Sequence, residues 1–251
     1  MGPMAWSDGV LVARQVVARN GAARDDRGIG RLVLAEILPP EVMAAEAFED
    51  LPGVVLFPEE EAVVARAVDK RRREFTTARA CARTALARLG LPPTAILPGA
   101  AGAPQWPPGV VGSMTHCAGY RASAVAWATD VLTLGLDAEP DEILPEGVLR
   151  TVALADERAG LQALAQSAPG PCWDRLLFSA KESVYKAWFP LTGRWLGFEE
   201  AAITFDPVDG TFAARLLVPG PQLDGRPLTG FAGRWLARDG LVLTAIAIPR
   251  G

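Results

Sequence analysis

Two carboxylates spaced two residues apart are the first side chains of this sequence that could carry out chemistry. Asp137 and Glu139 lie in the segment LGLDAE at 134–139. Side chains alternate between the two faces of a β-strand, so a strand here places both carboxylates on one face. Like charges at that spacing repel each other unless a cation lies between them, and hard oxygen ligands suit magnesium. The same pattern is also typical of two solvated carboxylates at a strand end.

A second set of polar side chains belongs to a predicted helix at 173–189. Ser179, Glu182 and Lys186 project opposite to its apolar face. Glu182 and Lys186 are four residues apart, which fits a surface ion pair worth about 0.3–0.5 kcal/mol. The spacing fits equally a carboxylate for metal binding or proton transfer beside an ammonium for phosphate. The chain has 22 arginines but only three lysines, and two of these, Lys181 and Lys186, lie in this helix.

Groups that could bind phosphate occur in two further places. The only histidine, His116, follows Thr115 at the end of an apolar strand, where imidazole, hydroxyl and backbone amides can bind phosphate. A core histidine fits the same position. The basic run KRRR at 70–73 is followed by Arg79 and Arg83, and arginine forks bind phosphate through paired hydrogen bonds. Most of this basic set also fits a solvated helix face.

Helices and strands are mixed in both halves of the chain. Short apolar runs predict strands at 10–17, 32–38, 110–115, 121–128, 132–139, 202–205, 211–217, 230–236 and 241–248. Helical patterns lie at 59–89 in one or two pieces, at 146–166 with a break near Leu154, and at 173–189 before Pro190. We expect an α+β chain with two comparable halves, 1–130 and 131–251, that meet near Asp130.

Composition excludes several classes of protein. Half of the 251 residues are hydrophobic and 22% are charged, which is ordinary for a globular chain and excludes whole-chain disorder. A net charge of −4 argues against bulk nucleic-acid binding. The longest uncharged run, 89–120, contains six prolines and six glycines, so no membrane span is expected. Three widely spaced cysteines and the absence of a signal-peptide pattern predict a cytoplasmic protein with reduced thiols.

In this order the motifs resemble those of the 4′-phosphopantetheinyl transferases of the surfactin/enterobactin-synthetase type. That family carries Ser/Thr-His after a Gly/Pro-rich stretch, then G-[IVL]-D-x-E, then [FW]-[ST]-x-K-E-[SA]-x-x-K. The corresponding segments here are MTH at 114–116, GLDAE at 135–139 and FSAKESVYK at 178–186. The basic helix and the segment GVVGS at 109–113 are most similar to the enterobactin-synthetase branch. The resemblance extends from about Lys70 to the end of the chain.

The resemblance implies two pseudo-symmetric α+β halves with coenzyme A bound in the cleft between them. Asp137, Glu139 and Glu182 would surround a magnesium ion on the pyrophosphate, and Lys186 would contact that pyrophosphate. The catalytic set would be Glu182, Lys186 and Asp137, with Glu182 taking the proton of the attacking hydroxyl directly or through a water molecule.

At the nucleotide end, the resemblance implies that His116 and Thr115 hold the 3′-phosphate of coenzyme A. Arg79, and less closely Arg72, match the arginines that anchor this end. One departure is Ala103, in the segment GAP at 102–104, where the family often has a basic residue. Another basic residue must then contact the nucleotide phosphates, or the contact is missing.

The implied reaction is attack by a serine of an apo acyl or peptidyl carrier protein on the β-phosphorus of coenzyme A. Phosphopantetheine moves to the serine, and adenosine 3′,5′-bisphosphate leaves. Carriers of polyketide and nonribosomal-peptide synthesis fit this branch, and a monomer suffices because the site lies within one chain. The chain is acidic, so docking of an acidic carrier needs a local patch, for which Arg150, Arg158 and Arg175 are candidates. The alternatives are a magnesium-dependent hydrolase of coenzyme A or a nucleotide pyrophosphate, and a non-catalytic nucleotide-binding module.

Overall fold

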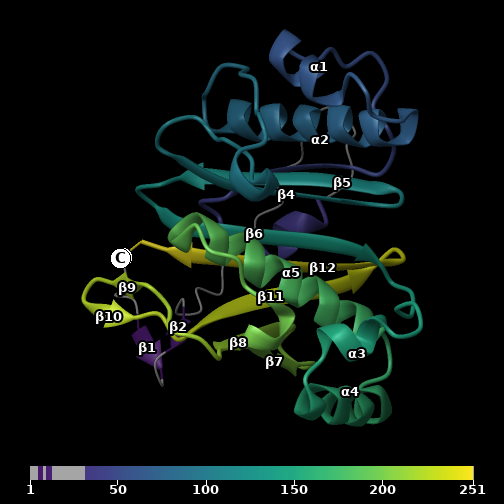
Figure 1. The fold of residues 1–251 in the computed structure, drawn as a ribbon, viewed down its shortest axis with the longest axis vertical. Coiled ribbons are helices and arrows are strands. Elements are labelled where there is room, and N and C mark those ends of the chain that lie inside the picture. The colour runs from purple at the N-terminus through teal and green to yellow at the C-terminus, as the bar shows by residue number, and fades with distance from the viewer. Residues whose placement is uncertain (1–4, 8–9, 13–31, 251) are drawn as a thin grey trace.

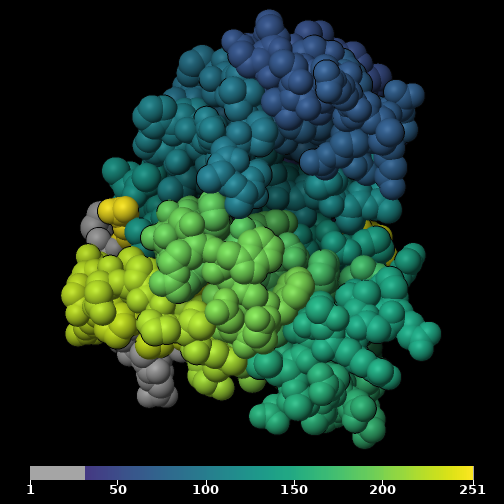
Figure 2. All heavy atoms as spheres, in the orientation of Figure 1, coloured from purple at the N-terminus to yellow at the C-terminus, as the bar shows by residue number. Residues whose placement is uncertain are grey.

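Two sheets and two long helices form four successive layers. The structure, a computed structural model, describes residues 5–7, 10–12 and 32–250. Helix α2 (Asp69–Arg88) covers one face of a small sheet, and α5 (Trp173–Thr192) covers one face of a larger sheet (Figure 1). The two remaining faces enclose a shared core, so the order of layers is helix, sheet, sheet, helix. In the space-filling view, green atoms of the α5 region lie directly below the blue and teal N-terminal half (Figure 2).

The small sheet is made of three antiparallel strands in the order β3-β5-β4. The elements up to this sheet are η1 (Leu34–Glu36), β3 (Met43–Ala47), α1 (Pro58–Val64), α2, η2 (Ala100–Gly102), β4 (Val110–Cys117) and β5 (Tyr120–Trp127). Buried Ala82 and Leu86 of α2 pack against Val125 of β5. Small residues on the helix allow this close packing, and the core excludes water from that face of the sheet.

The larger sheet follows the order β1-β2-β11-β12-β6, with β8 also paired to β11 and β7 to β8. Its elements are β1 (Ala5–Ser7), β2 (Val10–Val12), β6 (Val131–Pro140), β7 (Ala201–Asp206), β8 (Thr211–Leu216), β11 (Gly230–Arg238) and β12 (Leu241–Pro249). The other elements of this half are α3 (Val148–Val152), α4 (Ala155–Ser167), η3 (Phe198–Glu200), β9 (Gln222–Leu223) and β10 (Arg226–Pro227). Alternation along β12 directs Val242 and Ile246 toward α5, and Leu243 toward the small sheet.

Side-chain hydroxyls join the two sheets where β4 lies beside β6. Ser113 Oγ accepts the N–H of Leu136 over 3.0 Å, and Thr115 Oγ1 accepts the N–H of Ala138 over 3.0 Å. Both hydroxyl residues are buried. These bonds satisfy backbone groups of β6 that have no partner strand on that side, and they set the register of β6 against β4.

Most predicted elements are confirmed, and the structure has the expected mixture of helices and strands. The helical region 59–89 is two helices, and 146–166 breaks at Leu154, as expected. The strand predicted at 32–38 is wrong, because residues 34–36 form a 3-10 turn whose entry N–H groups, from Val33 and Leu34, bond to the Glu46 carboxylate. Only 10–12 of the strand predicted at 10–17 is described, and 13–17 lies outside the described residues.

Two further differences concern α5 and β3. Helix α5 continues through Pro190 to Thr192 and ends at Gly193, whose φ is 62° and whose N–H bonds to the Phe189 carbonyl. Proline is accommodated because it falls in the last turn, so the expected end before it was wrong. Strand β3 was not predicted at all. Among the described residues, no helix is both long and apolar enough to cross a membrane.

Candidate active site

Gly135 brings α5 against β6. A Cβ at this position would lie 2.0 Å from the carbonyl oxygen of Ser183 and 3.0 Å from the Ala187 Cβ. Only glycine therefore allows this approach of the helix to the strand. Thr133 strengthens the contact, because its hydroxyl donates to the Ala187 carbonyl over 2.8 Å. Since Asp137 lies two residues beyond Gly135 on the same face, the contact brings it beside the polar side of α5.

Asp137 is the most enclosed carboxylate of this region, at 4% exposure. Its Oδ1 accepts hydrogen bonds from Lys186 Nζ over 2.7 Å and from Thr115 Oγ1 over 3.2 Å. Its Oδ2 is buried and has no hydrogen-bond partner. A buried carboxylate oxygen without a partner carries a desolvation cost, which a bound cation would remove.

Two further carboxylates accompany Asp137: Glu139 on the same strand, β6, and Glu182 on helix α5. Burial, then the charge of Asp137, raises the pKa of Glu139 to about 7. Burial, then the charge of Asp137, also raises the pKa of Glu182. The charge of Asp137 thus acts on both glutamates, as expected for a site that receives a cation.

Basic side chains neutralise two of these carboxylates in the structure. Lys186 pairs with Asp137, and Arg175 Nη1 lies 3.1 Å from Glu139 Oε2. Within the described ranges, no three His, Cys, Asp or Glu side chains converge closely enough, as they stand, to hold a metal ion. The donor set still fits a hard cation in kind, because it offers carboxylate oxygens and the unpartnered Asp137 Oδ2.

His116, the residue after Thr115 on β4, contacts the basic helix α2. Arg71 Nη1 lies 2.8 Å from His116 Nε2, and Glu74 Oε2 lies 3.9 Å from the same nitrogen. Burial, then the charge of Arg71, lowers the pKa of His116. A neutral imidazole beside an exposed guanidinium can bind an anion. In the sequence, Arg71 was distinguished only as part of the basic run 70–73.

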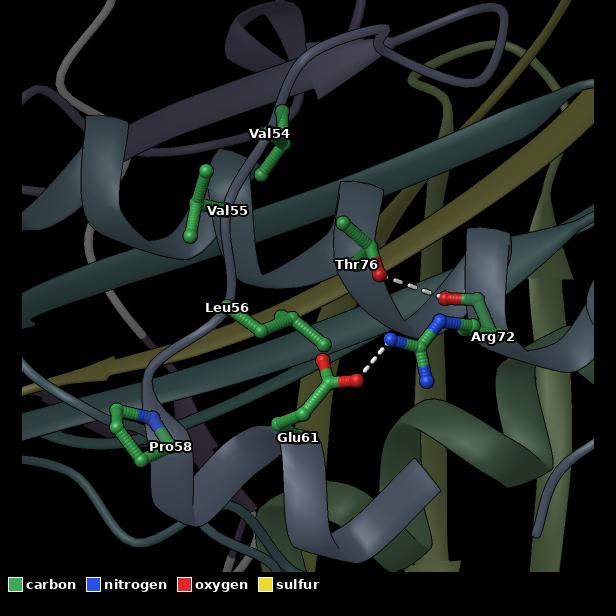
Figure 3. A pocket seen from close by; sticks show the side chains of 7 residues that line it. All are labelled: Val54, Val55, Leu56, Pro58, Glu61, Arg72 and Thr76. Carbon is green, nitrogen blue, oxygen red and sulfur yellow. Dashed lines mark hydrogen bonds and ion pairs between the residues drawn. The ribbon is translucent and has the colours of Figure 1, made fainter. Parts of the chain in front are cut away.

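Arg72 and Arg73, the next two residues of the basic run 70–73, do not contact His116 and have other partners. Arg72 pairs with Glu61 and lines a hollow of about 560 Å³ between α2 and the segment 54–58 (Figure 3). Arg73 Nε bonds to Asp50 Oδ2 over 3.1 Å. Successive residues on a helix are about 100° apart, so only Arg71 of these three faces His116.

Two other predicted nucleotide ligands are buried. Arg79 is 8% exposed, stacks 3.7 Å from the Phe75 ring centre and donates to the Ile96 carbonyl over 3.1 Å. Burial lowers the pKa of Arg79 to about 10. The Thr115 hydroxyl is engaged by Asp137 and Ala138 within the seam. The structure thus groups Asp137, Glu139, Glu182 and Lys186 at one place, and His116 with Arg71 at another.

A second hollow, of about 300 Å³, opens beside Glu182. Its lining includes Tyr185, Trp195 and Leu196. The rings of Tyr185 and Trp195 lie 4.8 Å apart, and the Tyr185 hydroxyl is buried with no hydrogen-bond partner. This hollow could not be predicted from the sequence. Trp195 lies beyond the end of α5 and is brought beside Tyr185 by the turn that begins at Gly193.

Comparison with known proteins decides the family. A model described as the 4′-phosphopantetheinyl transferase N-terminal domain matches residues 59–126, and one for the 4′-phosphopantetheinyl transferase superfamily matches 133–226. The 4′-phosphopantetheinyl transferase Svp of Streptomyces mobaraensis is 59% identical over 219 residues, covering 86% of this chain and 89% of the relative. The chain belongs to the 4′-phosphopantetheinyl transferase superfamily. It is therefore a transferase of 4′-phosphopantetheine.

Other relatives agree with this membership. The 4′-phosphopantetheinyl transferase PptT of Mycobacterium tuberculosis is 50% identical over 228 residues, which cover 88% of this chain and 99% of that one. Enterobactin synthase component D of Salmonella typhi is 34% identical over 140 residues, which cover 54% of this chain and 55% of that relative. The branch that the motifs resembled is thus present among the relatives, at lower identity than the first two.

The two lysines of the transferase motif have different surroundings. Lys186 is partly exposed and pairs with Asp137. Lys181 is buried, with its Nζ 2.8 Å from Glu157 Oε2 and 2.7 Å from the Phe198 carbonyl. Glu157 also accepts the N–H of Ile203 over 2.7 Å. Lys181 thus ties α5 to α4 and the following strand, whereas Lys186 faces the carboxylates.

Proposed function

We propose that this chain uses Mg²⁺ to transfer 4′-phosphopantetheine from coenzyme A to a serine of an apo carrier protein, with release of adenosine 3′,5′-bisphosphate. The observation that carries the magnesium assignment is Asp137 Oδ2, a buried carboxylate oxygen without a partner beside two carboxyl groups of raised pKa. Asp137, Glu139 and Glu182 would hold the ion. When bound, it would neutralise the pyrophosphate and the charge that develops on the leaving phosphate.

Lys186 is proposed to contact the pyrophosphate of coenzyme A. Its ammonium now lies 2.7 Å from Asp137 Oδ1, so a small rotation of a flexible side chain would redirect it to phosphate. A positive charge placed where the leaving group gains negative charge lowers the barrier to transfer. The side chain is 26% exposed, which leaves it accessible to substrate.

Glu182 is proposed to accept the proton of the attacking serine. A new bond forms between the serine oxygen and the β-phosphorus, and the bond to the leaving phosphate oxygen breaks. The raised pKa of Glu182 makes it a stronger base than an exposed glutamate, which has a pKa near 4.3. Its place beside the hollow lined by Tyr185 and Trp195 supports this role, because that hollow could receive the pantetheine arm.

The nucleotide end of coenzyme A is proposed to bind at His116. Arg71, 2.8 Å from the imidazole, would supply the guanidinium that pairs with the 3′-phosphate. It would take the place of the basic residue that the segment around Ala103 lacks. Arg72 and Arg79 would act more remotely, since Arg72 pairs with Glu61 and Arg79 is buried.

Several further properties belong to the same proposal. We propose that the chain divides near Asp130, with the nucleotide-end residues in 1–130 and the carboxylate residues in 131–251. The carriers are proposed to be those of polyketide and nonribosomal-peptide synthesis, and the enzyme is proposed to act as a cytoplasmic monomer. Three free cysteines support a reducing compartment.

The reaction is tested with the protein, coenzyme A, Mg²⁺ and several folded apo carrier domains, weighed as intact proteins. We expect one phosphopantetheine on the carrier serine, and no gain when a chelator removes the metal. Adenosine bisphosphate released without a carrier adduct would favour the hydrolase instead. Neither product, together with nucleotide binding that does not need magnesium, would favour the binding module.

Replacing Glu182 by Gln separates proton transfer from binding. We expect kcat to fall by about 10²–10⁴-fold, because general base catalysis contributes about that much. The KM for coenzyme A should rise by a smaller factor than kcat falls, since the amide keeps the shape of the side chain and one oxygen for the cation. Transfer by the variant at the parental rate would exclude Glu182 as the base.

A further inference from the structure

The Arg175 guanidinium faces inward and holds three acceptors. Its Nη1 donates to Glu139 Oε2 over 3.1 Å, its Nε to the Glu142 carbonyl over 2.9 Å, and its Nη2 to the Ile143 carbonyl over 3.2 Å. The side chain is 14% exposed. From the sequence Arg175 was expected to dock carriers, but its charged group is engaged by these three acceptors of the same chain.

The turn that Arg175 holds is tied to the start of α5 from both sides. Asp141 Oδ1 accepts the N–H of Cys172 over 2.7 Å, and Asp174 Oδ2 accepts the N–H of Leu144 over 3.0 Å. The turn presents Ile143 outward, with 77% of its surface exposed. Arg175 is the side chain that links this turn to a carboxylate of the cluster.

We propose that Arg175 is a positioning residue that orients the Glu139 carboxylate for the cation and fixes the turn 140–144. This inference rests on the proposed function, in which Glu139 holds magnesium. Arg175 donates to Oε2 and thereby determines how the other oxygen, Oε1, is aimed. Hydrogen bonds to a ligating carboxylate restrict its rotation, and their loss typically weakens metal binding by about 10–100-fold.

The planar shape of the guanidinium matters as much as its charge. Three donors in a fixed fork can hold a carboxylate and two carbonyls at once, whereas an ammonium on a shorter reach cannot. Measured well above pH 7, where Glu139 carries its charge, a purely electrostatic role predicts the opposite result for metal, because removing a positive charge near the ionised cluster would strengthen cation binding. The sign of the change therefore distinguishes positioning from charge.

The test compares Arg175→Met and Arg175→Lys with the parental protein. Arg215→Met serves as the matched control, because Arg215 is exposed on β8 in the other part of this sheet. Calorimetry measures the Kd for Mg²⁺ with coenzyme A present and no carrier, so that no turnover occurs. Hydrogen exchange followed by mass spectrometry reports the amides of 140–146 without metal, and thermal unfolding checks that each variant is folded.

We expect the Kd for Mg²⁺ to rise about 10–100-fold in Arg175→Met, less in Arg175→Lys, and not in Arg215→Met. Exchange at 140–146 should be faster in Arg175→Met. An unchanged or lower Kd, or unchanged exchange, would overturn the inference. If Arg175→Met does not fold, the same outcomes in Arg175→Lys decide. If the parental protein binds no Mg²⁺, the proposed metal role fails, and exchange at 140–146 still tests the positioning of the turn.

Discussion

Thr115 of β4 and Asp137 of β6 meet across the line where the two sheets join. The threonine hydroxyl donates to Asp137 Oδ1 over 3.2 Å and accepts the N–H of Ala138 over 3.0 Å. One hydroxyl therefore satisfies the β6 backbone and orients the carboxylate at the centre of the site. Thr115 of the MTH motif and Asp137 of the GLDAE motif, 22 residues apart in the sequence, thus belong to one seam between β4 and β6.

Replacing Thr115 by Val tests the seam. Valine keeps the shape but leaves the buried Ala138 N–H without an acceptor, which costs about 1–3 kcal/mol of unfolding free energy. Urea unfolding measures this loss, and we expect the rate of transfer to fall as well because Asp137 loses a partner. Thr204→Val, at an exposed position of β7, should change stability by less than about 0.5 kcal/mol. Equal effects of the two substitutions would contradict the role of Thr115.

His116 should contribute to binding of the 3′-phosphate of coenzyme A and not to binding of the two pyrophosphate groups. Charge-assisted hydrogen bonds contribute about 1.5–3 kcal/mol, so His116→Ala should raise the KM for coenzyme A roughly tenfold or more. The KM for 3′-dephospho-coenzyme A should change by less than about twofold, since that analogue lacks the phosphate. Arg71→Met should behave alike. A similar rise for both substrates would place His116 elsewhere on the ligand.

Glu139 should make magnesium binding depend on pH near neutrality. The pKa of this carboxyl is raised to about 7, so a proton competes with the cation below that pH. The Kd for Mg²⁺ should rise by up to about tenfold for each unit of pH below 7 and level off above it. Calorimetry at pH 6, 7 and 8 measures this trend, and a flat profile would contradict the assignment.

Without metal, the Glu139 carboxyl should make the free energy of unfolding depend on pH. Between pH 4.5 and about 7 the folded state binds more protons at Glu139 than the unfolded state, so unfolding free energy falls as pH rises. In Glu139→Gln this contribution is absent. The unfolding free energy of the variant minus that of the parental protein should therefore be larger at pH 8 than at pH 5. The opposite order would show that the pKa is not raised.

Lys181 should be required for stability because it is buried against Glu157. Replacing it by Met leaves the Glu157 carboxylate buried without its cation, and breaking such a pair costs about 3–5 kcal/mol. Chemical unfolding measures the loss. Lys70→Met, at an exposed position of α2, should be within about 0.5 kcal/mol of the parental protein. A small loss in Lys181→Met would mean that its charge acts in the reaction rather than in the fold.

Local sequence patterns were sufficient where the structure follows a simple period. Alternation placed Asp137 and Glu139 on one face of a strand, and helical spacing placed Glu182 and Lys186 on one side of a helix. Gly135 allows this strand and this helix to touch. The glycine is part of the GLDAE motif, but the spacing of the motif does not reveal the contact.

Features that depend on distant contacts could not be predicted. The apolar run at 32–38 fits a strand, but the Glu46 carboxylate binds the N–H groups at its start and stabilises a turn. The rotation of α2 about its axis selects Arg71 over Arg72 for His116, and no local pattern fixes that rotation. Arg175 was assigned to the surface for the same reason, since its acceptors lie more than 30 residues away.

The central claim is that a divalent cation binds at Asp137 Oδ2, and anomalous diffraction tests it most directly. Crystals of the protein with coenzyme A and Mn²⁺, used in place of Mg²⁺, would locate the ion from its anomalous signal. We predict one peak within about 2–2.5 Å of Asp137 Oδ2, with oxygens of Glu139 and Glu182 turned toward it. A peak away from Asp137, or no peak with coenzyme A fully bound, would contradict the account.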